Sequence, residues 1–490
     1  MQDTSPNDVP RRRWRGMRYA AVALLLLAGA VYAGLYSLTG RPVTLPVWVT
    51  EQAESRLNAA LDGTSVSLGG VELLVEAGTL PRLVMRNVGI YDARGVELAR
   101  LNELGARIDR ARLFSGEVQP RRLNLSGAQI TLRRRADGTF DVSFGGDLET
   151  SGTLTGVLDS IDRAFASEPL SAVERISADQ LTIAIEDARS GRVWQVTGGE
   201  LTLDHGQDRL DLSVAAEVFN GTEEMASAVI GFYKAKGSAE ATLTASFENA
   251  AAADIAAQTP ALAFLEVLDA PISGAIRASM NAGGGVEDLA GTLEIGDGAL
   301  QPAPGAQRVR FGGARAYFDY DPARDRISFD ELSLESDAVT VAASGHAYLR
   351  EYRNGWPGAL VGQVRTRMLR AAPAGVFEEP VEFDEGAVDF RLRLDPFTME
   401  IGQVALKEGG RHIVGQGSVT ADAEGWTVGM DVSVNEIEHE RLLALWPVRF
   451  ARGAREWLTE NIRAGMLYDI EGAIRAAPGQ PPRLSVSYTF

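Results

Sequence analysis

The stretch RRLNLSGAQITLRRRADGTFDVSF, residues 121–144, decides the fold class. Leu123 and Leu125 alternate with polar neighbours, and Ile130 and Leu132 repeat the alternation after a Ser-Gly break. Because successive side chains of a strand point to opposite faces, this period of two predicts strands with one apolar face. The Asp-Gly pair that follows is typical of a tight hairpin turn. The stretch therefore predicts paired antiparallel strands.

Similar alternating pairs recur along most of the chain. They lie at residues 178–187, 198–218, 239–248, 314–336, 339–349, 387–395 and 425–434. Gly, Asp and Asn separate them, so the sequence predicts on the order of 25 to 30 short strands joined mostly as hairpins. The candidate positions on the apolar face are Leu123, Leu125, Ile130, Leu132, Leu181, Ile183 and Ile185.

Four stretches have a helical period instead of a strand period. Residues 45–63 place Val49, Ala53 and Leu57 on one side, and Gly63 is typical of a helix end. Further helices are expected at 153–166, 252–268 and 442–465. These helices interrupt the strands, so the sequence predicts successive β segments separated by helices.

The stretch 442–465 attracts attention because Pro447 cannot continue a sheet ladder. Behind it, Phe450, Trp457, Leu458 and Ile462 share one side of the expected helix. One hypothesis is that this helix caps the apolar face, with Trp457 as a large apolar wedge. The other is a packing helix at a domain junction.

The composition excludes several classes of function. The chain has 48 Lys and Arg against 66 Asp and Glu, a formal net charge of −18. This balance argues against nucleic acid as a partner, because phosphate binding needs clustered cations. Cysteine is absent, which excludes disulfides and thiolate chemistry. The histidines, at 205, 346, 412 and 439, lack the spacing of metal ligands and are expected on strands or the surface.

Three charged segments have ordinary structural explanations. Residues 319–325, DYDPARD, resemble a calcium loop only faintly, because Ala323 and Arg324 occupy ligand and turn positions, so a hairpin turn is expected. The acidic group at 378–385 is expected to be a solvated loop, and Arg133–Arg135 to protect a strand edge. No catalytic residue, metal site or cofactor is predicted, so we do not expect an enzyme.

The N-terminus predicts a membrane anchor. Five arginines between residues 11 and 18 precede an uncharged run from Tyr19 to Leu38, long enough at about 1.5 Å per residue to cross a bilayer. The anchor residues are Tyr19, Leu24, Leu25, Leu26, Leu27, Val31, Leu35 and Leu38. The arginines favour a cytoplasmic N-terminus, with the bulk of the chain outside the cytoplasm. A cleaved signal peptide is the alternative, because residues 28–30 form an Ala-Gly-Ala site.

Several motifs together resemble one family. After the predicted anchor, residues 79–140 look like the N-terminal region of the AsmA-like envelope proteins, with a strand, an N-V-x-I-x-D hairpin and a strand ending near arginines and D-G. Residues 269–300 and 442–465 resemble the YhdP branch, with a Pro-x-x-Gly entry into a strand and a W-P followed by an R-x-W helix ending in Gly. The resemblance covers nearly the whole chain.

This resemblance implies a function in the bacterial envelope. The expected fold is mainly β, with an N-terminal transmembrane helix, a long curved antiparallel sheet that forms a groove, and a few amphipathic helices. The implied protein is anchored in the inner membrane and carries phospholipid passively through the periplasm to the outer membrane. The alternative is a scaffold for outer-membrane or periplasmic envelope proteins, which would pair with exposed sheet edges.

The expected organisation follows from the anchor and the helices. It comprises a basic N-terminus (1–18), the transmembrane helix (19–38), an N-terminal β region (45–150), β segments at 151–250 and 251–440, and a helix with the start of a further segment (441–490). The final residues alternate Leu484, Val486, Tyr488 and Phe490. We expect them to be a strand of an incomplete β segment; a terminal signal for outer-membrane assembly is the rival interpretation.

Overall fold

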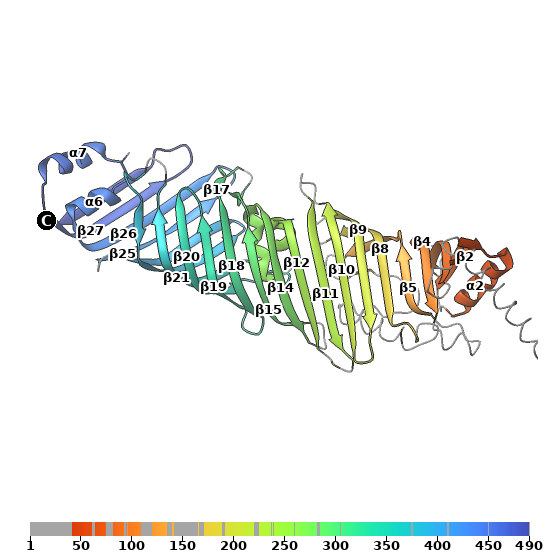
Figure 1. Cartoon of the computed structure of the whole chain (residues 1–490). Coiled ribbons are helices and arrows are strands. Elements are labelled where there is room, and N and C mark those ends of the chain that lie inside the picture. The colour runs from red at the N-terminus through yellow and green to blue at the C-terminus, as the bar shows by residue number, and fades with distance from the viewer. Residues whose placement is uncertain are drawn as a thin grey trace, which may run out of the picture. The chain divides into compact units, whose positions relative to one another are not determined.

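The computed structural model shows a chain made mainly of β-strands (Figure 1). The chain divides into two compact units. It describes residues 42–490 except 61–63, 75–81, 93–94, 96, 109–119, 135–139, 142–164, 166–170, 189–191, 220–224, 237, 239, 259, 282–284, 304, 374–375, 409–410, 449 and 490. Unit 1 holds most of the residues up to 181, and unit 2 holds residues 182–490 with two short earlier segments. The predicted antiparallel β architecture is confirmed within each unit.

Unit 1 is an antiparallel sheet with one parallel pairing. Its elements are β1 (Pro42–Thr44), α2 (Val47–Ala60), β2 (Thr64–Leu74), β3 (Arg82–Asp92), β4 (Glu97–Ile108) and β5 (Pro120–Ser126). Each of these strands pairs with the next, and β8 (Arg175–Asp187) runs parallel to β5. β6 (Gln129–Arg134) pairs with both β4 and β7 (Phe140–Asp141). The predicted helix at 45–63 is confirmed, with its expected apolar side half-buried.

Unit 2 is a meander in which each long strand pairs with the next one. Its strands are β9 (Arg192–His205), β10 (Arg209–Phe219), β11 (Ala226–Ala235), β12 (Ala241–Ala251), β14 (Pro271–Met280), β15 (Val286–Ile295), β18 (Gly313–Asp321), β19 (Arg326–Glu335), β20 (Val339–Arg350), β21 (Ala359–Ala371), β23 (Glu385–Leu394), β24 (Phe397–Glu408), β25 (Arg411–Ala421), β26 (Trp426–Glu438), β27 (Met466–Ala476) and β28 (Arg483–Thr489). All these pairings are antiparallel. β22 (Val381–Phe383) is a short strand beside β21.

The two edges of the unit 2 sheet differ in their connections. Here an edge means one of the two sides of the sheet along which the strands begin and end. On one side, which we call the short-turn edge, tight turns join β18 to β19, β23 to β24 and β25 to β26. The Asp321 carboxylate accepts hydrogen bonds from the backbone N–H groups of Ala323 and Arg324, so the predicted hairpin turn at 319–325 is confirmed. The opposite edge, the long-connection edge, carries the segments 252–270, 296–312 and 439–465.

The long connections contain the described helices of unit 2. The predicted helix at 252–268 is present in two pieces, α5 (Ala252–Ala256) and the 3₁₀ helix η1 (Pro260–Val267), because Pro260 cannot continue the helical hydrogen bonds. The predicted helix at 442–465 is likewise split around Pro447, into α6 (His439–Leu445) and α7 (Arg452–Asn461). The strands β13 (Leu268–Asp269), β16 (Gly298–Leu300) and β17 (Val309–Phe311) form a separate small sheet.

Two sequence predictions fall largely outside the described residues. The predicted membrane anchor at 19–38 lies there entirely, and of the predicted helix at 153–166 only Phe165 is described, as buried. Among the helices that the structure does describe, we find none with the length and apolar character needed to cross a bilayer.

Candidate functional site

An unbroken row of apolar residues crosses the whole sheet of unit 2. Its members are directly paired from one strand to the next, in the order Leu203, Leu212, Phe232, Leu243, Ala278, Leu289, Tyr320, Ile327, Ala347, Gly362, Phe390, Ile401, Gly417, Met430, Ile474 and Leu484. The row begins on β9 and ends on β28. Because paired residues of neighbouring strands share a face, all these side chains lie on one face of the sheet.

A second row on the same face is equally apolar. It runs through Leu201, Val214, Ile230, Ala245, Ile276, Gly291, Phe318, Phe329, Gly345, Val364, Val388, Val404, Gly415, Val432, Gly472 and Val486. We call the face that carries both rows the apolar face. Elsewhere on the described part of this face, Thr366 is a polar residue in the strand interior. Polar or charged residues at strand ends include His205, Lys234, Glu408 and Arg411.

Small residues on the apolar face lie beside large ones. Gly362 pairs with Phe390, Gly417 with Met430, and a Cβ added to Gly291 would meet the Phe318 ring at 2.9 Å. Glycine in a strand interior is typical of close approach between neighbouring chains and of bends in a sheet. The glycines therefore let neighbouring large side chains fold down against the backbone.

The opposite face of the same sheet is polar. The row beside the two apolar ones includes Thr202, Ser213, Thr244, Arg277, Asp319, Ser328, His346, Gln363 and Asp389. On this face the Gln363 amide donates a hydrogen bond of 2.6 Å to Asp389, and Arg475 pairs with Asp431 at 2.6 Å. The alternation in the sequence therefore places polar residues on one face of the sheet and apolar residues on the other.

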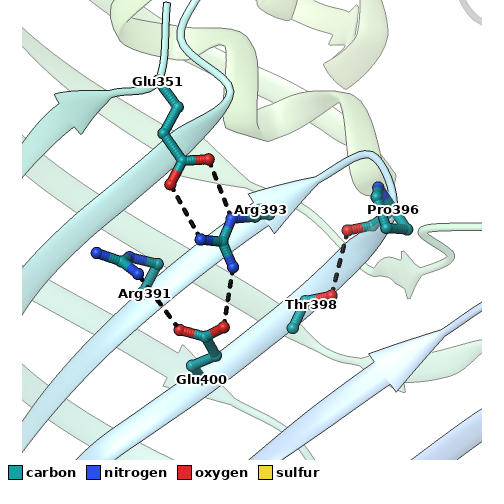
Figure 2. A network of polar contacts seen from close by, with 6 residues as sticks. All are labelled: Glu351, Arg391, Arg393, Pro396, Thr398 and Glu400. Carbon is teal, nitrogen blue, oxygen red and sulfur yellow. Dashed lines mark hydrogen bonds and ion pairs between the residues drawn. The ribbon is translucent and has the colours of Figure 1, made fainter.

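Arg393 is the centre of an ion network at the short-turn edge (Figure 2). It donates two hydrogen bonds of 3.0 Å to the carboxylate of Glu351 and one of 2.9 Å to Glu400, which also lies 3.7 Å from Arg391. Thr398, in the same view, donates to the carbonyl of Pro396. The hydrogen bonds from Arg393 lower the pKa of the Glu351 carboxyl below its ordinary value.

This network predicts a titration shift. We expect Arg393→Gln to raise the pKa of Glu351 back towards its ordinary value, measured by NMR titration of the side-chain carboxyl. Because the folded-state pKa is lowered, the contribution to stability is present above the ordinary pKa and is lost as the pH falls through the lowered value. Arg100→Gln is the control, since it removes two similar hydrogen bonds to Glu97 without touching Glu351. An unchanged Glu351 pKa in Arg393→Gln would contradict the assignment.

Part of the apolar face is covered by the connections 252–270 and 296–312. Ala252, Ala261 and Leu262 belong to the same buried cluster as Ile272, Leu293 and Leu349 of the sheet. Ile272 and Leu349 are completely buried there. The buried sheet residues of this cluster lie on the middle strands, from β12 to β21.

A second cover lies near the C-terminal strands. Leu442 and Trp446 of the α6 region and Leu458 of α7 pack with Val434 and Ile470 of the apolar face. The Trp446 indole N–H donates a hydrogen bond of 2.9 Å to the carbonyl of Phe450. The α6–α7 segment therefore covers the face at the long-connection edge of β26 and β27.

The structure corrects the predicted role of Trp457. This side chain is 56% exposed, whereas Leu458 is buried and Ile462 and Phe450 are partly buried. Successive helical residues are about 100° apart, so the i, i+4 pair Leu458 and Ile462 turns Trp457 away from the sheet. The buried tryptophan of this segment is Trp446, which precedes Pro447 and which the helical pattern of the sequence did not single out.

The predicted apolar positions of the first strands are divided between the units: Leu123, Leu125, Ile130 and Leu181 belong to unit 1, and Leu132, Ile183 and Ile185 to unit 2. Leu123 and Leu125 pair with Ala106 and Leu104 of β4 and with Ile176 and Ala178 of β8, and all are apolar. Leu181 is buried and Ile183 is partly buried. The side chains of Ile130, Leu132 and Ile185 lie outside the described residues, as do those of Arg133–Arg135.

The charged and histidine-bearing segments hold no catalytic constellation among the described residues. Glu378, Glu382 and Glu385 of the acidic group form ion pairs with Arg455, Arg370 and Lys407. His205, His346 and His412 lie on separate strands and His439 begins α6. No group of three potential ligands capable of holding a metal ion occurs in the described part of the chain.

Two hollows on the unit 2 surface are lined mostly by residues of the polar face. One, of about 680 Å³, is lined by residues that include Gln416, Asp431, Glu471 and Ser485. Another, of about 650 Å³, is lined by residues that include Ser213, Thr244 and Asp319. These linings belong largely to the polar face.

The comparisons with known proteins leave the family open. The chain matches no family model, and neither the curated proteins nor the solved structures contain a significant match to it. A proposal for the function therefore depends on the structure itself, in which the unit 2 sheet has one apolar and one polar face.

Proposed function

We propose that this protein binds phospholipid acyl chains on the apolar face of its curved unit 2 sheet and carries them passively between the inner and outer membranes. The observation that carries the proposal is the pair of unbroken apolar rows from β9 to β28. A ligand that moves along the sheet meets no charged residue in either row. Lipid transfer of this kind needs no catalytic residue and no cofactor, because the lipid moves along one surface without a change in its covalent bonds.

The energetics favour a hydrocarbon ligand. Each methylene removed from water contributes about 0.8 kcal/mol, so an acyl chain gains many kcal/mol by lying on the face. A protein rarely leaves so continuous an apolar surface without a partner. On β11, Ile230 of the second row is 45% exposed, whereas Phe232 of the first row on the same strand is 4% exposed.

The start of the chain fits a membrane protein. Val47 and Trp48, which begin α2, are 72% and 66% exposed and follow the predicted anchor by about ten residues. Exposed apolar and aromatic residues at this position are typical of the membrane interface. The proposal places the N-terminus in the cytoplasm and the two units in the periplasm of a bacterium.

A matched pair of substitutions on β11 tests the proposal. Ile230 and Val229 are neighbours with nearly equal exposure, 45% and 46%, but they lie on opposite faces. The full chain in micelles is mixed with a phospholipid whose acyl end carries a photoreactive group, and the adducts are mapped by mass spectrometry. We expect Ile230→Glu to reduce adducts on the surrounding strands roughly tenfold, because a carboxylate beside hydrocarbon is costly.

The control variant introduces the same carboxylate on the same strand, but on the opposite face. Val229→Glu should leave the number of adducts unchanged, since its side chain lies on the polar face. Wild-type adducts spread equally over both faces, or an equal loss in the two variants, would refute lipid binding on the apolar face. The scaffold alternative, with envelope proteins as partners, would then become the better explanation.

A further inference from the structure

The connection between β15 and β18 reaches from one edge of the unit 2 sheet to the other. It leaves and rejoins the sheet at the long-connection edge, at Ile295 and Gly313. In between, Ala303 and Ala306 pack with Phe397 and Ala421, which lie at the short-turn edge of β24 and β25. We call residues 301–303 and 305–308 of this connection the strap.

The strap is held at its far end by specific contacts. The Trp426 indole N–H donates a hydrogen bond of 2.6 Å to the carbonyl of Gln307, across 119 positions of sequence. The ring of Trp426 stands edge-to-face on Phe397, with centroids 5.8 Å apart. Gly305 approaches so closely that a Cβ there would lie 2.0 Å from the carbonyl oxygen of Ala423. Only glycine allows this contact between the strap and the β25–β26 turn.

The strap lies across the path that a ligand would follow along the apolar face. On one side of it are the strands β9 to β11, where Ile230 is exposed, and on the other side are β27 and β28. Where the strap packs, Ala306, Phe397 and Ala421 are almost completely buried, at 4%, 6% and 4% exposure. An acyl chain has no room at these contacts while the strap is seated.

We propose that the strap controls lipid movement between the two ends of the unit 2 sheet, and that it must detach from Phe397, Ala421 and Trp426 before a lipid passes. This inference rests on the proposed lipid-carrying function. A polar headgroup stays in water above the face, so it meets the strap even when the acyl chain lies flat. Lipids with larger headgroups are therefore held back more strongly.

A reversible lock tests the proposal directly. The natural chain has no cysteine, so in the double variant Ala306→Cys with Ala421→Cys the two introduced thiols are the only ones. Because Ala306 packs with Ala421, oxidation is designed to join the strap to β25 by a disulfide. The full-length variant is incorporated into donor vesicles with a fluorescent phosphatidylethanolamine, and transfer to acceptor vesicles is followed. We expect the oxidised variant to transfer lipid at least tenfold more slowly than the reduced variant, with the disulfide verified by mass spectrometry. The single variant Ala306→Cys should be insensitive to the oxidant.

A second variant loosens the strap without a disulfide. Trp426→Phe retains an aromatic ring against Phe397 but removes the hydrogen bond to Gln307. We expect roughly two- to tenfold faster transfer, the range that corresponds to losing one hydrogen bond in the seated state. Tyr352→Phe is the control, because it removes an exposed side-chain hydrogen bond, from the Tyr352 hydroxyl to the Asp325 carboxylate, in the connection between β20 and β21.

The outcomes separate this inference from the function on which it rests. Equal transfer by the oxidised and reduced double variants, together with an unchanged rate in Trp426→Phe, overturns the role of the strap but leaves lipid transfer standing. No transfer by the wild type, with no acyl-chain adducts on the apolar face, overturns the proposed function and the strap inference with it.

Discussion

Replacing Ile272 with Ala is expected to lower the free energy of unfolding of unit 2 by about 2–5 kcal/mol. Ile272 lies on β14 and is completely buried, in the cluster with Ala252 and Leu262 of the α5–η1 connection. The substitution removes apolar contacts and leaves a cavity that the neighbouring strands cannot close. Urea unfolding followed by tryptophan fluorescence measures the loss.

The control is an identical substitution on the open part of the same face. Ile230→Ala, at a residue that is 45% exposed, should cost well under half as much, because little packing is lost there. Together the two variants show where the apolar face is covered by protein and where it faces the outside. Equal losses would mean that β11 is covered as well, which contradicts an open surface for acyl chains.

Replacing Gly345 with Ala is the second prediction with a large effect. A Cβ at this position of β20 would lie 2.2 Å from the carbonyl oxygen of Gln363 on β21, and the backbone there cannot yield as a flexible side chain does. Overpacking of this kind typically costs about 1–3 kcal/mol and occasionally more. We expect a lower unfolding midpoint in urea, with the strands flanking β20 and β21 displaced.

Gly402→Ala is the comparison for this glycine. It is a strand glycine of the same sheet, but the nearest atom to its added Cβ is 3.8 Å away, which is ordinary contact. The unfolding midpoint of this variant should stay close to that of the wild type. If both variants unfold alike, the glycines of the apolar face are not places of close backbone approach.

The sequence predicted the parts of the fold that depend on local pattern. The alternation in residues 314–336 and 387–395 gave the strands and their faces, because a period of two assigns each side chain to one side. Pro447 marked the last of the helical connections. The sequence could not give the register, and the register is what aligns Leu203 with Leu484 in one row across the sheet.

The candidate site was only partly predictable for the same reason. Which residue covers the face depends on contacts distant in sequence, and the hydrogen bond from Trp426 to Gln307 spans 119 positions. The helical pattern of 442–465 placed Trp457 on the buried side, whereas the actual helix begins only at Arg452 and turns that residue outward. The strap has no pattern at all, since Gly305 and Ala306 read as an ordinary loop.

The meander of unit 2 also determines how such a molecule can change in length. Each strand pairs only with its neighbours in sequence, so a hairpin inserted at the short-turn edge extends the sheet without reordering any other pairing. Neighbouring strands are about 4.8 Å apart, so each added hairpin lengthens the sheet by roughly 10 Å. Duplication of single hairpins is thus a route by which evolution could fit the same architecture to compartments of different width.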